Sequence, residues 1–148
     1  MTTKTPHRLL PIIALCSLSA CVNDAASLQI DGKEHSLSIV REQKWLWEKR
    51  VDLFIVVTRM PDCQRRHRLK GSSISAATFE VFTPDATTFY IQQGARTYSV
   101  ETKTCEGFQD LGEKAPTSMG QKLGTFKEVD GIFRFIDEPG AAGQPADK

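Results

Sequence analysis

The residues of this sequence that most clearly suggest binding form a short run of basic side chains. Residues 64–70 have the sequence QRRHRLK, in which Arg65, Arg66, Arg68 and Lys70 carry formal positive charge. Guanidinium groups bind phosphate and carboxylate in a forked geometry, so the run predicts contact with anions. Lipid phosphate, lipopolysaccharide or an acidic protein patch would each fit. The alternative is a solvated loop whose arginines pair with Asp62 and other carboxylates.

Two tryptophans form a second candidate contact. Trp45 and Trp47 are separated by one residue and would share a face if they lie on a strand. If exposed, they would form a stacking platform for a sugar or a peptide. Because large aromatic side chains usually pack against the core, we expect them to cover the hydrophobic core instead.

The sequence contains none of the common catalytic or nucleotide-binding motifs that we considered. The patterns G-x-S-x-G, H-E-x-x-H, S-x-x-K and G-x-x-x-x-G-K-[ST] do not occur. We therefore predict no catalytic residue, no metal site and no cofactor.

Nucleic acid is not an expected partner either. The 19 basic residues are nearly balanced by 18 acidic ones, and residues 64–70 contain no aromatic side chain for stacking on bases.

The N-terminus has the organisation of an export signal. Lys4 and Arg8 form a basic start, followed by the uncharged apolar run LLPIIALCSLSA at 9–20. A helix over that run would rise only about 18 Å, too short for a hydrocarbon core of about 30 Å. A charged start, a short apolar stretch and small residues at its end are typical of a cleaved signal peptide, here 1–20.

The end of this segment is more specific. Leu18-Ser19-Ala20-Cys21 resembles the lipobox of bacterial lipoproteins, an aliphatic residue and two small residues before cysteine. The resemblance implies that Cys21 receives a diacylglyceryl group on sulfur, that the signal is removed before it, and that the new amine is acylated, for example with palmitate. It also implies a membrane as partner. In that family an aspartate directly after the cysteine favours retention in the inner membrane. Because Val22 stands there, the resemblance implies the outer membrane, facing the periplasm.

Processing of this kind leaves two cysteines for other roles. Cys16 is lost with the signal and Cys21 is lipidated, so Cys63 and Cys105 remain. In an oxidising compartment an even pair predicts a disulfide. A zinc site at Cys63, His67 and Cys105 is the alternative, but it lacks the fourth ligand that structural zinc requires.

The elements that would position these residues are mostly strands. Apolar and polar residues alternate over short stretches separated by turn residues, with Asp31-Gly32 and Asp130-Gly131 as hairpin signals. Residues 51–58, VDLFIVVT, are nearly all apolar and suggest a central strand covered on both faces. Residues 43–50 fit either a helical turn or a strand. The expected fold is mainly β: a small antiparallel sheet, sandwich or barrel of about seven to eight strands.

These patterns divide the chain into a cleaved signal (1–20), a lipidated cysteine with a short polar tether (21–27), a β-rich periplasmic domain (28–137) and a disordered tail (138–148). Residues 106–124 are expected to form a long loop. The sequence favours a membrane-anchored binding or structural module of the cell envelope. The open alternatives are an inhibitor of a lysozyme or protease presenting residues 59–71, an assembly factor of an envelope complex, and a small hydrolase.

Overall fold

The structure is a computed structural model that describes residues 21–140. Strands dominate these residues, with one short 3-10 helix, η1 (Ile74–Ala76). The strands are β1 (Asn23–Gln29), β2 (His35–Glu42), β3 (Arg50–Arg59), β4 (Cys63–Ser73), β5 (Phe79–Thr83), β6 (Thr88–Gln93), β7 (Arg96–Glu101), β8 (Gln109–Gly112), β9 (Gln121–Val129) and β10 (Ile132–Asp137). The mainly β prediction is confirmed, with ten strands in place of the expected seven or eight.

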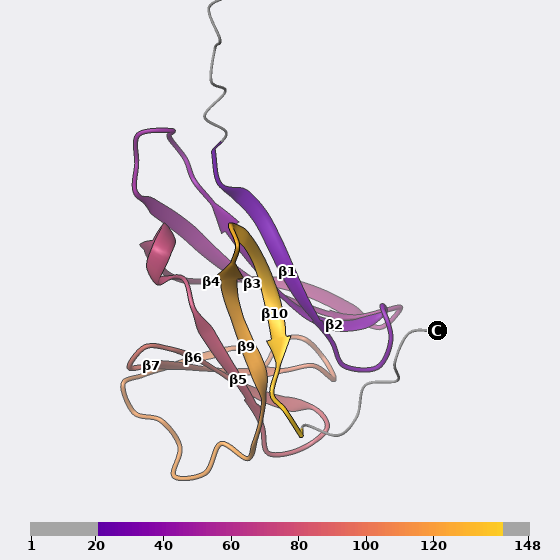
Figure 1. The fold of residues 1–148 in the computed structure, drawn as a ribbon. Helices are drawn as coiled ribbons and strands as arrows, with labels where there is room; N and C mark the ends of the chain where they lie inside the picture. Colours follow the sequence, from indigo (N-terminus) through magenta and orange to yellow (C-terminus); the bar gives the residue numbers. More distant parts are fainter. Residues whose placement is uncertain (1–20, 141–148) are drawn as a thin grey trace, which may run out of the picture.

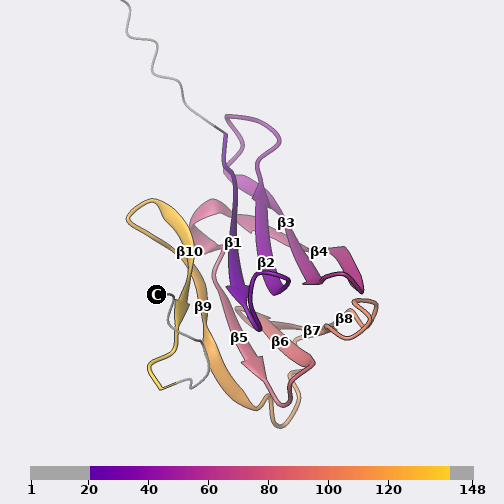
Figure 2. The ribbon, with the colours of Figure 1, turned by 90° about the vertical axis from the view of Figure 1, so that its right-hand side faces the viewer.

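The strands form two antiparallel sheets (Figure 1). One has four strands in the order β1-β2-β3-β4, and the other has six in the order β10-β9-β5-β6-β7-β8. They are not closed into a barrel. Figure 2 shows that the six-stranded sheet curves, with β10 beside β1 and β8 near β4. The smaller sheet is thus contacted near both of its edges.

One hydrophobic core lies between the sheets. Alternate residues of β2 and β3, such as Leu37, Ile39, Leu53 and Ile55, are fully buried there, as period-two alternation requires. The six-stranded sheet contributes aromatic residues including Phe126. The expectation that residues 51–58 are covered on both faces is wrong. β3 is a central strand, but Asp52, Phe54 and Val56 on its second face are only partly buried.

The predicted hairpin turns are confirmed. Asp31-Gly32 lies in the connection between β1 and β2, and Asp130-Gly131 joins β9 to β10 directly. Asp130 and Gly131 both adopt positive φ, 53° and 74°. Two consecutive positive φ angles match the twist of paired strands, and Asp-Gly tolerates them.

The predicted disulfide is also confirmed. Cys63 at the start of β4 is bonded to Cys105 between β7 and β8, with Cα atoms 6.0 Å apart. It therefore links the two sheets covalently. Because its sulfurs are bonded to each other, the alternative metal site has lost two of its ligands.

Several predicted boundaries are wrong. The polar stretch within 21–27 is not a tether, because Asn23–Gln29 pairs with β2 as β1. The basic run at 64–70 is not a loop but part of β4, and the expected loop at 106–124 contains β8 and the start of β9. In each case pairing with a neighbouring strand satisfies the backbone of a segment whose side chains are polar. Most of the predicted tail, 141–148, and the signal, 1–20, lie outside the described residues.

Candidate functional site

Strand β4 distributes the predicted basic patch over two faces. Side chains alternate along a strand, so Arg66 and Arg68 lie on the outer face of the four-stranded sheet, opposite Val56 and Phe54 of β3. Arg65 points to the other side, where it pairs with Glu106 at 3.7 Å. The four basic residues therefore do not form one continuous surface.

Lys70 lies toward the second sheet. Its backbone N–H donates to the Tyr98 hydroxyl at 2.9 Å. Its charge also acts on Asp110 of β8. Partial desolvation would raise the pKa of Asp110, but hydrogen bonds from the Gly112 N–H and the Arg96 guanidinium hold this pKa below its usual value. The charge of Lys70 acts in the same direction. This lysine thus contributes to the contact of β4 with the six-stranded sheet.

Arg66 covers an aromatic ring on the outer face. Its guanidinium carbon lies 3.7 Å from the centroid of Phe54, and its Nη2 lies 2.8 Å from an oxygen of Glu42. A stacked guanidinium keeps its charge at the surface while its planar group covers apolar area. This contact explains how an apolar residue on the outer face of β3 is partly shielded without a second layer of structure.

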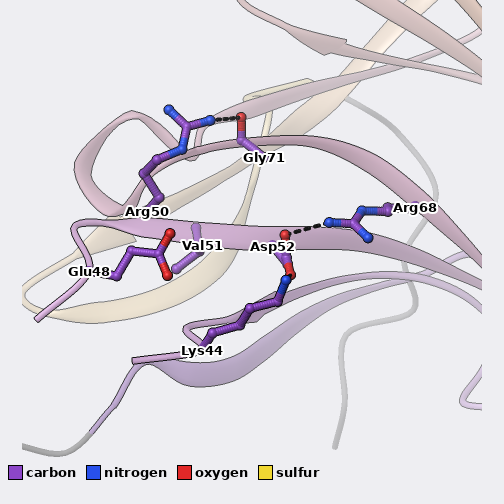
Figure 3. A pocket seen from close by; sticks show the side chains of 7 residues that line it. All are labelled: Lys44, Glu48, Arg50, Val51, Asp52, Arg68 and Gly71. Carbon is purple, nitrogen blue, oxygen red and sulfur yellow. Dashed lines mark hydrogen bonds and ion pairs between the residues drawn. The ribbon is translucent and has the colours of Figure 1, made fainter. Parts of the chain in front are cut away.

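Arg68 belongs to a charged group at the end of the sheet nearest the β2–β3 loop. It donates to Asp52 at 2.7 Å, and Lys44 approaches the other oxygen of Asp52 at 3.2 Å (Figure 3). The predicted alternative, in which these arginines pair with Asp62 and other carboxylates, is right about carboxylates but not about Asp62 or about a loop. Their carboxylate partners are Glu42, Asp52 and Glu106.

A small polar pocket lies beside this group. It encloses about 190 Å³, less than the roughly 300–1,000 Å³ of a typical drug-sized site. The residues that line it are Lys44, Glu48, Arg50, Val51, Asp52, Arg68 and Gly71. Three cations face two carboxylates, so the lining has a formal excess of one positive charge. A pocket of this size and charge fits a single anionic group.

Arg50 is the cation of this pocket with the most free capacity. Its Nη2 donates to the Gly71 carbonyl at 3.2 Å (Figure 3). Within residues 21–140 it takes part in no ion pair, whereas Lys44 and Arg68 share Asp52. Most of the five donors of a guanidinium remain available for a ligand. Sequence inspection missed this residue because it stands outside the basic run.

The two tryptophans do not cover the core, contrary to our expectation. Trp45 and Trp47 lie in the β2–β3 loop and are 57% and 78% exposed. Their rings stack on each other with centroids 5.5 Å apart and an angle of 13° between planes. Residues 43–49 form a loop with one hydrogen-bonded turn at 45–48 and no strand, so the face-sharing argument for strands does not apply to the tryptophans.

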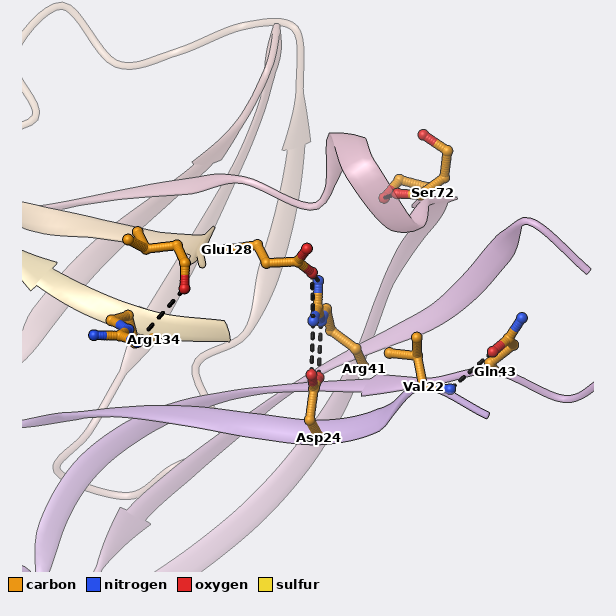
Figure 4. A network of polar contacts seen from close by, with 9 residues as sticks. Val22, Asp24, Arg41, Gln43, Ser72, Glu128 and Arg134 are labelled. Carbon is orange, nitrogen blue, oxygen red and sulfur yellow. Dashed lines mark hydrogen bonds and ion pairs between the residues drawn. The ribbon is translucent and has the colours of Figure 1, made fainter. Parts of the chain in front are cut away.

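A buried arginine joins the two sheets near the first described residues. Arg41 is 1% exposed, and it donates to both oxygens of Asp24 at 2.8 and 2.6 Å and to Glu128 at 3.1 Å (Figure 4). Its guanidinium carbon also lies 4.2 Å from the ring centroid of Phe133. These contacts connect β1 and β2 with β9 and β10. Hydrogen bonding to Asp24 is the main reason that the pKa of Arg41 is raised.

No protein-family model matches this chain, and neither the curated proteins nor the solved structures include a significant match.

Within residues 21–140, no cluster of three or more His, Cys, Asp and Glu side chains lies close enough to hold a metal ion. None of the helical segments in that part of the chain has the length and apolar character needed to span a bilayer.

Proposed function

We propose that this protein is a lipoprotein of the bacterial envelope, in which lipidated Cys21 holds a β-sandwich-like domain against the outer membrane as a binding module. The observation that carries the proposal is the position of Cys21 relative to the fold. β1 begins at Asn23, and Val22 is already hydrogen-bonded to Gln43. A lipid on Cys21 would therefore hold the domain directly at the membrane, because no free linker separates them.

The binding role is supported by the outer face of the four-stranded sheet. Arg66 and Arg68 are exposed there, and the pocket beside Arg50 has a formal excess of positive charge. Near an anionic membrane surface each basic residue can add about 1 kcal/mol of attraction. We infer that the module binds anionic groups of the envelope, either lipid phosphates or carboxylates of an acidic protein.

The inhibitor hypothesis receives no support from the segment on which it depended. An inhibitory loop must project from the domain into a target site. Most of residues 59–71 instead belong to β4, which is paired along its length with β3. An assembly role differs from a binding role only in the identity of the partner, and it remains compatible with the same surface.

The anchor is tested by the mass of the mature chain. The full chain is expressed in a Gram-negative bacterium, extracted with detergent and analysed by mass spectrometry. We expect loss of residues 1–20 and acyl groups on Cys21. Cys21→Ala should remain uncleaved by the lipoprotein route and carry no acyl group. Cys16→Ala is the matched control, since it removes a cysteine of the signal and should mature normally. A Cys21→Ala chain with the mass and membrane association of the wild type would refute the anchor.

A further inference from the structure

The β2–β3 loop presents an apolar surface that the domain leaves uncovered. Trp45, Leu46 and Trp47 are consecutive, and they are 57%, 53% and 78% exposed. The two indole rings are stacked on each other. Single exposed apolar residues are common, but three adjacent ones that include both tryptophans of the chain form a patch, and such patches mark contact surfaces.

Hydrogen bonds hold this loop in a defined shape. The Glu48 N–H donates to the Trp45 carbonyl at 3.0 Å, and Nε2 of Gln43 donates to the Glu48 carbonyl. The loop is thus closed at its base by side-chain and backbone contacts. Its aromatic residues are displayed on a turn, so their exposure is built into the fold.

The same glutamine fixes the loop beside the proposed lipid anchor. The Gln43 side-chain oxygen accepts from the Val22 N–H at 2.8 Å (Figure 4), and the Gln43 N–H donates to the Val22 carbonyl, also at 2.8 Å. Cys21 precedes Val22 and is exposed. Trp45 follows Gln43 by two positions, a backbone span of at most about 7 Å. The patch and the anchor therefore project from the same end of the domain, as Figure 1 also shows for the loop and the start of β1.

We propose that Trp45, Leu46 and Trp47 insert into the boundary between headgroups and acyl chains of the membrane that Cys21 anchors. Tryptophan is enriched at this boundary because its ring is largely apolar while its N–H can bond to water or headgroups. Lys44, Lys49 and Arg50 flank the patch in sequence, and cations next to an inserted apolar turn favour anionic lipid surfaces. This inference rests on the proposed lipidation of Cys21.

A lipid on Cys21 and an inserted β2–β3 loop would together fix the orientation of the domain on the membrane, whereas the lipid alone would not. β3 leads away from the loop for ten residues, about 30 Å at 3.3 Å per residue. Met60, 51% exposed, follows its far end. In this orientation Met60 lies remote from the membrane, whereas the pocket around Arg50 and Lys44 lies next to it.

Tryptophan fluorescence tests the insertion directly, because the chain contains only these two tryptophans. The full chain, extracted from the membrane, is reconstituted into vesicles of phosphatidylethanolamine and phosphatidylglycerol with or without bromine on the upper acyl carbons. We expect a shift of the emission to shorter wavelength and roughly twofold quenching by bromine, since rings at the boundary lie about 5–10 Å deep and reach those carbons. Trp45→Phe/Trp47→Phe/Met60→Trp is the matched reporter, and its emission should stay unquenched.

Mass spectrometry of the same samples separates the two proposals. If Cys21 is acylated and the wild-type emission is quenched no more than that of the Met60→Trp reporter, membrane insertion of the loop is refuted and the anchor stands. If Cys21 carries no acyl group, the proposed function fails and this inference fails with it.

Discussion

Val22 and Gln43 are joined by two hydrogen bonds, one to the side-chain oxygen and one from the backbone N–H of the glutamine, each 2.8 Å long. Through this pair Val22, the residue after Cys21, is held at the base of the β2–β3 loop, which carries Trp45 and Trp47. The pair therefore connects the proposed anchor with the surface that we propose to insert.

Gln43→Ala should loosen this end of the domain. The variant loses the bond that the Val22 N–H donates to the Gln43 side chain and the bond that this side chain donates to the Glu48 carbonyl, but it keeps the backbone bond from the residue 43 N–H to the Val22 carbonyl. Each neutral hydrogen bond contributes about 1 kcal/mol. We expect faster amide exchange at Val22 and Glu48 by hydrogen–deuterium exchange, with the core strands unchanged. Gln109→Ala, at an exposed position of β8, is the control. Equal exchange in both variants would show that Gln43 does not hold the loop.

Arg41 should be required for the contact between the sheets. Arg41→Met keeps most of the apolar stem but leaves Asp24 and Glu128 without their shared partner. We expect a loss of roughly 2–3 kcal/mol of unfolding free energy, since hydrogen bonds to charged groups contribute about 1.5–3 kcal/mol and both carboxylates can regain water. Urea unfolding followed by circular dichroism measures this, because the tryptophans are exposed and report poorly on the core. A smaller loss in Arg41→Lys than in Arg41→Met would assign part of the effect to charge alone.

The disulfide should contribute strongly to stability. Cys63 and Cys105 are 42 residues apart, and in the chain-entropy model closing such a loop stabilises the fold by about 4 kcal/mol. We expect Cys63→Ser/Cys105→Ser to lower the unfolding free energy by an amount of this order. Wild-type protein should show no free thiol from this pair when denatured without reductant. Unchanged stability in the double variant would mean that contacts such as His67 on Phe108 already hold the sheets together.

His35 should make the domain less stable at mildly acidic pH. Burial, and then the nearby charge of Arg59, lower the pKa of His35, while Asp31 opposes them. The unfolded chain therefore binds a proton more readily than the folded one, and stability that is present above pH 6.5 is lost as the pH falls below it. Unfolding free energies measured between pH 7.5 and 5.5 should decrease in the wild type. His35→Gln should flatten this dependence, and an unchanged slope would assign it to other groups.

Sequence alternation predicted the core better than it predicted the surface. Leu37, Ile39 and Arg41 all point inward from β2. The alternation thus indicated that Arg41 is buried, although its charge favoured an exposed position. The place of Arg66 over Phe54 depends instead on the register between β3 and β4. That register depends on the short connection between the two strands and on the irregularity between Val51 and Leu53, neither of which side-chain alternation specifies. The same holds for the polar residues of β1, whose strand forms only because β2 pairs with it.

The position of an arginine, and not only its charge, should decide how strongly this domain binds anions. Arg50 and Arg68 line the pocket, whereas Arg65 lies on the opposite face of β4 beside Glu106. Arg50→Gln, Arg68→Gln and Arg65→Gln each remove one positive charge from the chain. If the pocket holds an anionic group by hydrogen bonds, the first two should weaken binding of inorganic phosphate roughly tenfold, equal to about 1.4 kcal/mol, and Arg65→Gln should leave it nearly unchanged. Titration of the detergent-solubilised full chain, followed by NMR of the arginine side chains, provides the dissociation constants. Stability should change by no more than about 1 kcal/mol in each variant, because exposed ion pairs contribute little.

Raising salt weakens attraction between exposed charges over distances beyond about 8 Å. Equal weakening by all three substitutions, matched by high salt, would therefore show that phosphate responds to the overall charge and not to the pocket.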